Sequence, residues 1–144
     1  MKWTVDHSRT PLYIRVKVEG TPTVEDTLEL WEQLLSCKNW RPGTGLLIDN
    51  SEIGPGSAGS QILDALAKYL VIKQKAIGDS RIAVLGSKTD INRYSRQLEY
   101  GLKLRGVSSF IRNFGDELAA IEWLTARPQT INPEHFITLA NPHR

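Results

Sequence analysis

The feature that most constrains this 144-residue chain is an alternation of short apolar runs with longer amphipathic stretches. Residues 46–48 and 82–85 are continuously apolar, which is typical of strands buried on both faces of a sheet. The stretches between such runs follow a helical period over roughly 15 to 20 residues, a length that suits the crossover between parallel strands. The pattern therefore predicts a single α/β domain with a mixed, mostly parallel sheet.

Five strands and four helices are expected. The strands cover residues 3–6, 12–19, 46–49, 81–85 and 107–114, and the helices cover residues 23–36, 58–75, 89–104 and 116–124. In residues 12–19 apolar and polar side chains alternate, so Leu12 belongs to a buried face and Tyr13 to a solvated one. This strand and residues 3–6 are expected to form an antiparallel hairpin at the edge of the sheet.

Local signals mark where the helices begin and end. Thr23 and Asp116 are residues that commonly cap the first turn of a helix. Gly78 is expected to stop the second helix, because glycine adopts the backbone conformation that ends helices. Residues 50–60 between the central strand and this helix are expected to form a loop rich in glycine and serine.

Composition excludes several classes of protein. The chain is 40% hydrophobic and 24% charged, and its net charge of +2 is too small to indicate a nucleic-acid partner. Cys37 is the only cysteine, so no intrachain disulfide is expected, no spacing typical of metal ligands is present, and no cofactor is expected. The N-terminus lacks the apolar region of a signal peptide, and no apolar run is long enough for a transmembrane segment. A cytoplasmic location is therefore expected.

Two segments carry a resemblance to a known family. The order of the elements, together with RIAVLG at residues 81–86 and FGDELAAIEWL at residues 114–124, resembles the SpoIIAA-like branch of the STAS superfamily. The resemblance spans about residues 11–124, and a single domain is expected over residues 1–127. The three prolines of residues 128–144 indicate a tail, with a short helix or a dimer contact. The resemblance implies a non-catalytic regulatory or protein-interaction module, with a protein partner or a small-molecule ligand, and a homodimer is an open alternative.

The loop after the central strand contains the first candidate site. Residues 54–59 match G-x-G-x-x-G, but they do not open a helix directly after the first strand, so dinucleotide binding is disfavoured. Gly56 and Ser57 precede a helix, whose N-terminus favours anions such as phosphate. The resemblance implies a phosphorylated serine in this loop, and the nearest matches are Ser57 and, less closely, Ser51. The family's Asp-Ser-Ser/Thr-Gly pattern is absent, and the simpler interpretation of Ser57 is helix capping.

A second group of polar residues follows the buried strands. Asp49 ends the central strand, while Ser87 and Lys88 follow the next one, and ligands of open α/β sheets bind at this edge. These residues are candidates for holding a small anionic ligand. An alternative is an uncharacterised enzyme that uses the loop edge with Asp49 and Lys88, assisted by the nearby Glu52. The preferred interpretation of Asp49 is a hydrogen bond to backbone amides of its own loop.

The third helical stretch offers a candidate interaction surface. Arg93, Arg96 and Tyr100 share one face by their spacing, which suits a protein partner or a peripheral contact with anionic membrane headgroups. The same spacing also describes an ordinary solvated helix face. A last alternative comes from the related CRAL-TRIO fold, in which a lipid or another apolar ligand lies between a helix and the sheet.

Overall fold

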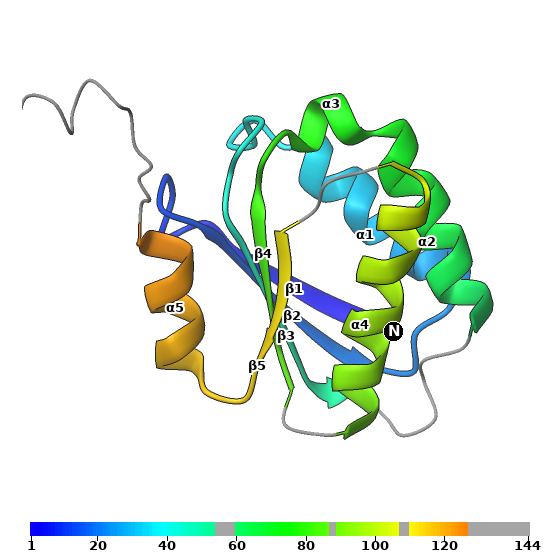
Figure 1. Ribbon diagram of the computed structural model, residues 1–144. Helices are drawn as coiled ribbons and strands as arrows, with labels where there is room; N and C mark the ends of the chain where they lie inside the picture. Colours follow the sequence, from blue (N-terminus) through cyan, green and yellow to red (C-terminus); the bar gives the residue numbers. More distant parts are fainter. Residues whose placement is uncertain (54–59, 87–88, 107–109, 127–144) are drawn as a thin grey trace, which may run out of the picture.

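A computed structural model describes residues 1–53, 60–86, 89–106 and 110–126 of the chain (Figure 1). Its five strands form one sheet in the order β1-β2-β3-β4-β5. β1 is antiparallel to β2, and the other neighbours are parallel, so the expected mixed, mostly parallel sheet is confirmed. The strands are β1 (Lys2–Asp6), β2 (Ile14–Gly20), β3 (Leu46–Ile53), β4 (Arg81–Leu85) and β5 (Phe110–Phe114).

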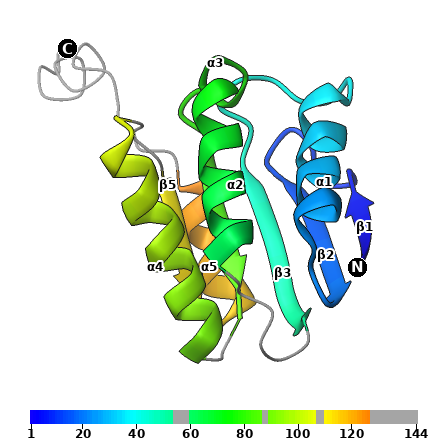
Figure 2. The same cartoon turned by 90° about the vertical axis from the view of Figure 1, so that its right-hand side faces the viewer.

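Helices cover the two faces of the sheet unequally (Figures 1 and 2). The three crossovers from β2 to β5 all step in the same direction across the sheet, and such crossovers share one hand, so their helices lie on one face. Of the described helices, only α5 packs on the opposite face, mainly over β4. The helices are α1 (Val24–Ser36), α2 (Ser60–Ile72), α3 (Gln74–Ile77), α4 (Thr89–Leu104) and α5 (Glu117–Thr125).

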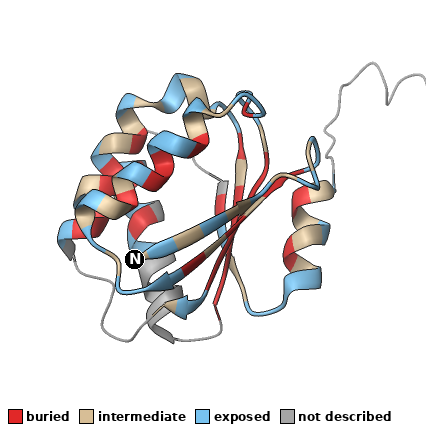
Figure 3. Ribbon diagram, turned by 180° about the vertical axis from the view of Figure 1, so that it is seen from behind, coloured by how far each residue is buried: buried red, intermediate tan, exposed pale blue. Residues whose placement is uncertain are grey.

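The larger apolar core lies between the sheet and helices α1, α2 and α4. Alternate residues of the strands point into it, because successive side chains of a strand face opposite sides of a sheet. Figure 3 shows the buried positions running along the strands and the sheet-facing sides of the helices. The most deeply buried side chains of this core are Ile14, Val16, Leu34, Leu46 and Leu102.

A smaller apolar core lies under α5. Leu47, Ala83 and Leu85 alternate along their strands with the residues that face the larger core. Ala120 and Leu124 of α5 pack on them. α5 therefore covers the central strands on this face. In the described part of the chain no helix lies over β1 on this face (Figure 1), and Lys2, Thr4 and Asp6 of β1 are exposed.

The predicted helix caps are confirmed. The Asp26 backbone N–H donates to Thr23 Oγ1 at 3.0 Å, and the Ala119 N–H donates to an Asp116 carboxylate oxygen at 3.2 Å. Gly78 ends α3 with φ of +64°, a conformation that side chains strongly disfavour.

The start of β2 differs from the prediction. Leu12 is 59% exposed and Tyr13 is only 4% exposed, the reverse of the expected alternation. The cause is the turn between β1 and β2, which continues to Leu12 because its N–H donates to the Arg9 carbonyl at 2.8 Å. The strand begins only at Ile14, and Tyr13 instead joins the small core under α5.

Two other boundaries also differ. β3 continues to Ile53, beyond the expected end at Asp49, so residues 50–53 belong to the strand and not to the expected loop. The expected second helix is divided at Lys73 into α2 and α3, which raises the number of described helices to five. The indole N–H of Trp40 donates to the Ala76 carbonyl at 2.8 Å and holds this separate last turn in place. The expected tail, residues 128–144, lies outside the described residues.

Candidate functional site

Asp49 lies near the carboxyl end of the central strand β3, where ligands of open α/β sheets commonly bind. Its neighbours in register are Lys17 of β2 and Leu85 of β4, which places its side chain on the face that carries α5. The residue is only 8% exposed. A carboxylate in such a position requires hydrogen-bond partners, because burying an unpaired charge is costly.

A bulge in β3 supplies the first of these partners. Lys17 lies opposite Asp49, but Glu19, two residues later, lies opposite Glu52, so β3 contains one extra residue. Within this irregular stretch the Ser51 N–H donates to Asp49 Oδ1 at 3.0 Å, and Ser51 Oγ donates to the same oxygen at 2.6 Å. The expected bond from Asp49 to a nearby backbone amide is therefore present, although Ser51 belongs to the longer strand.

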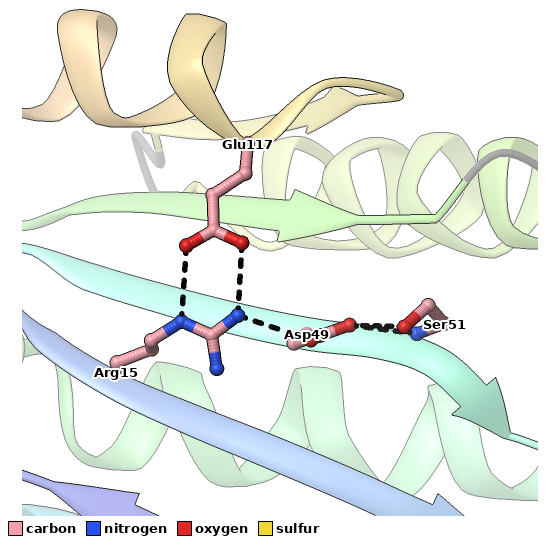
Figure 4. A network of polar contacts seen from close by, with 4 residues as sticks. All are labelled: Arg15, Asp49, Ser51 and Glu117. Atoms are coloured by element: carbon pink, nitrogen blue, oxygen red, sulfur yellow. Dashed lines mark hydrogen bonds and ion pairs between the residues drawn. The ribbon is translucent and has the colours of Figure 1, made fainter.

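Arg15 of β2 supplies the other partner and joins Asp49 to α5 (Figure 4). Its Nη2 lies 3.1 Å from Asp49 Oδ2 and 3.0 Å from Glu117 Oε1, and its Nε donates to Glu117 Oε2 at 3.3 Å. The guanidinium thus binds Glu117 with two parallel hydrogen bonds, the arrangement that gives arginine–carboxylate pairs their specificity. Sheet and helix are held together by one polar network of Arg15, Asp49, Ser51 and Glu117.

The network keeps Asp49 and Arg15 charged at neutral pH. Burial of Asp49 opposes ionisation, but the hydrogen bonds from Ser51 and the charge of Arg15 outweigh it, and the pKa of Asp49 lies below its ordinary value of 3.8. The hydrogen bond to Glu117 raises the pKa of Arg15 further above its already high value. An acid or base that works near neutral pH needs a pKa in that range. Asp49 is therefore placed to support structure and carries a pKa unsuited to proton transfer at neutral pH.

Other candidates at this edge have different outcomes. Glu52 is exposed and in register with Glu19, another carboxylate. Gly56, Ser57, Ser87 and Lys88 lie outside the described residues, so an anionic ligand in these loops and an active site with Lys88 both stay predictions.

The expected interaction surface on α4 is described in part. Arg96 is exposed and Tyr100 is 64% exposed, whereas the side chain of Arg93 lies outside the described part of the chain. One turn beyond Tyr100, Leu104 is 67% exposed, so Arg96, Tyr100 and Leu104 form a stripe at helical spacing. We call these three residues the α4 stripe.

Sequence reasoning missed three residues of these two surfaces. Leu104 follows Tyr100 by four positions, so the helical spacing that places Tyr100 on this face also places Leu104 there. Arg15 and Glu117 are 102 positions apart, and no local pattern indicates that they meet.

The described residues contain neither a metal-binding cluster nor a membrane-spanning helix. Among them, no group of three or more histidine, cysteine, aspartate or glutamate side chains is arranged to hold a metal ion. In the same residues, none of the helices has the length and apolar character needed to cross a membrane.

Comparison with known proteins identifies the fold. The sequence matches no family model and no curated protein. Its structure is similar to the crystal structure of an uncharacterised DUF3478-family protein with a SpoIIAA-like fold from Shewanella loihica PV-4. The TM-score is 0.57, and the match covers 85% of this chain and 92% of the other. The chain has a SpoIIAA-like fold. Because the two sequences are only 20% identical, the likeness concerns the SpoIIAA-like fold and leaves the activity open.

Proposed function

We propose that this SpoIIAA-like domain is a non-catalytic interaction module that binds a protein partner through the α4 stripe. The observation that carries the proposal is the exposure of Tyr100 and Leu104, two large side chains one helical turn apart on the outer surface of α4. Single exposed apolar residues are ordinary on protein surfaces, but an adjacent pair beside an arginine resembles the composition of binding sites.

The chemistry of the stripe suggests what its partner offers. Tyrosine and arginine are enriched among the residues that dominate binding energy, and they act best in pockets from which water is excluded. A complementary partner presents an apolar pocket for Tyr100 and Leu104 and a carboxylate for Arg96. The helix supplies a rigid backbone for this contact, which lowers the entropy lost on binding.

Two observations on the rest of the molecule favour binding over catalysis. The carboxylate at the end of the central strand is already engaged by Ser51 and Arg15, and its low pKa does not suit acid–base work at neutral pH. The described side chains between the sheet and α1, α2 and α4 form a contiguous apolar cluster, which favours a packed core over a lipid site of the CRAL-TRIO kind.

Site-specific photo-cross-linking in the cells that make the protein tests the proposal. A photoreactive phenylalanine analogue replaces Tyr100 in one variant and Leu118 in a control variant. Leu118 is 71% exposed but lies on α5, on the opposite face of the sheet. The proposal predicts a discrete protein adduct at position 100 and none of the same mass at position 118. Absence of an adduct at position 100, or the same adduct at both positions, would overturn it.

A further inference from the structure

The outer edge of β1 is a second surface whose residues indicate a binding partner. β1 is the first strand of the sheet, and in the described part of the chain it pairs with β2 alone. Its five residues pair with β2 without a register shift, so the strand is regular from Lys2 to Asp6. A regular edge strand presents unpaired backbone groups that accept another strand, unless a proline or a bulge interrupts it.

The sequence of this strand, KWTVD, is complementary to itself when two copies run antiparallel. With Thr4 opposite Thr4 of a second copy, Lys2 lies opposite Asp6 and Trp3 lies opposite Val5, each pair occurring twice. Opposite charges, paired threonines and an aromatic residue beside a β-branched one are the cross-strand pairs that stabilise antiparallel ladders.

We infer that a second copy of this chain binds at this edge, with the two β1 strands antiparallel about a two-fold axis at Thr4. The axis follows from symmetry, because a two-fold contact uses the same patch on both subunits. The register follows from the charges, because only pairing centred on Thr4 uses all five residues and places each Lys2 opposite an Asp6.

The surroundings of the strand fit this arrangement. Lys2, Thr4 and Asp6 are exposed, whereas Trp3 and Val5 are half-buried against the larger core. The indole N–H of Trp3 donates to Gln33 Oε1 at 2.9 Å, which holds this ring against α1. Asp6 accepts the Ser8 N–H at 2.9 Å, and this bond lowers the pKa of Asp6, so the carboxylate is charged at neutral pH.

The other edge of the sheet does not offer the same complementarity. β5 has the sequence FIRNF, and antiparallel pairing of two copies about its centre places Arg112 opposite Arg112. Like charges directly opposite each other destabilise a ladder. The contact at β1 does not involve the α4 stripe. α4 packs on α2 and β5, and β5 lies at the opposite edge of the sheet from β1 (Figure 2).

Sedimentation equilibrium of the purified full chain tests the inference by charge reversal. A ladder of five residues is small for a protein interface, so we expect a weak dimer that forms at concentrations of roughly 10–500 µM. Lys2→Asp places two carboxylates at each end of the ladder, and Asp6→Lys places two ammonium groups there. Each variant alone is expected to dimerise at least about tenfold more weakly than the wild type.

Mixing the two variants gives the decisive result. In a heterodimer, one end of the ladder pairs the introduced carboxylate of one variant with the introduced ammonium group of the other. The opposite end keeps the native pair of Lys2 and Asp6, so an equimolar mixture is expected to recover association.

Two controls accompany the mixing experiment. Lys75→Asp makes the same charge change on the exposed surface of α3 and is expected to dimerise like the wild type. Asp6→Lys removes the bond from Ser8, so its fold is checked by circular dichroism. If it does not fold, Lys2→Asp against Lys75→Asp remains a complete comparison.

Three results would overturn the inference. The first is a wild type that stays monomeric over the whole concentration range, and the second is a Lys2→Asp variant that dimerises as strongly as Lys75→Asp. The third is a mixture of two folded variants that does not associate.

Discussion

Replacing Arg15 by methionine is expected to weaken the attachment of α5 to the sheet. The substitution keeps an unbranched apolar side chain of similar length but removes the guanidinium. Asp49 then loses its only cationic partner of the network, although both hydrogen bonds from Ser51 remain, and Glu117 loses two hydrogen bonds. The variant therefore separates the contribution of the charge from that of the stem of the side chain.

The size of the effect follows from the burial of each partner. The side chain of Asp49 is 11% exposed, and a hydrogen bond to a charged group in such a place is worth about 1.5–3 kcal/mol. Glu117 is 46% exposed, and ion pairs of this kind contribute about 0.2–1 kcal/mol. The free energy of unfolding is thus expected to fall by about 2–4 kcal/mol.

Urea unfolding followed by tryptophan fluorescence measures this loss. The midpoint is expected to fall by roughly 1–2 M with little change in the m-value. Arg9→Met, which removes an exposed arginine in the turn after β1, is the control and is expected to change stability by less than about 0.5 kcal/mol. Amide hydrogen exchange adds a local measure, because α5 is expected to lose protection before α1 does.

A double-mutant cycle with Asp49→Asn identifies the cause. Asparagine keeps an oxygen that accepts the bonds from Ser51 but carries no charge, so Arg15→Met costs less in this background. We expect a coupling energy of at least about 1 kcal/mol. If Arg15→Met changes stability no more than Arg9→Met does, the network does not hold α5, and the structural role assigned to Asp49 is wrong.

The remaining two predictions concern Gly101 and acid stability. Gly101→Ala is expected to stabilise the protein by about 0.5–1 kcal/mol in urea unfolding, since a Cβ in this helix interior lies 3.6 Å from Ala67 Cβ, an ordinary contact. Gly78→Ala is the contrast and is expected to destabilise it, because Gly78 has φ of +64° and its added Cβ comes within 3.0 Å of Pro42. Asp49 has a lowered pKa in the folded state, so its contribution to stability is present above its ordinary pKa and is lost as the pH falls through the lower folded value. The free energy of unfolding is therefore expected to decrease as the pH is lowered from about 4 to about 2, and to decrease less steeply in Arg15→Met than in the wild type. Measurements between about pH 7 and pH 2 test this, and equal slopes in the two proteins would contradict it.

The architecture was predictable because it depends on patterns within single elements. The apolar runs of β3 and β4 and the helical stretches between them determine a parallel sheet, and the caps at Thr23 and Asp116 are local chemistry. The boundaries were less accessible. The bulge in β3 arises where it pairs with β2, and the first turn places Tyr13 under α5, so both depend on contacts between elements distant in sequence.

The candidate site was predictable only in its position. The sequence indicated Asp49 at the end of the central strand and Tyr100 on a helix face. The structure places Tyr100 on α4 as expected, but β3 continues for four residues beyond Asp49. The partner that determines the charge of Asp49 was not accessible, because Arg15 occupies a polar position of β2 that looks like any solvated strand residue. Leu104 was accessible, since helical spacing alone places it beside Tyr100.

Binding is expected to depend on the α4 stripe, whereas Asp49 is expected to serve the fold. Calorimetric titration of the cross-linked partner, once identified, against four folded proteins tests both statements most directly: wild type, Leu104→Ala, Leu118→Ala and Asp49→Asn. Leu118 is a leucine of similar exposure on α5, on the opposite face of the sheet, and serves as the matched control. We expect Leu104→Ala to weaken binding by roughly tenfold or more, while Leu118→Ala and Asp49→Asn bind like the wild type. Loss of binding in Asp49→Asn with full affinity in Leu104→Ala would contradict both statements and place the function near the end of the central strand.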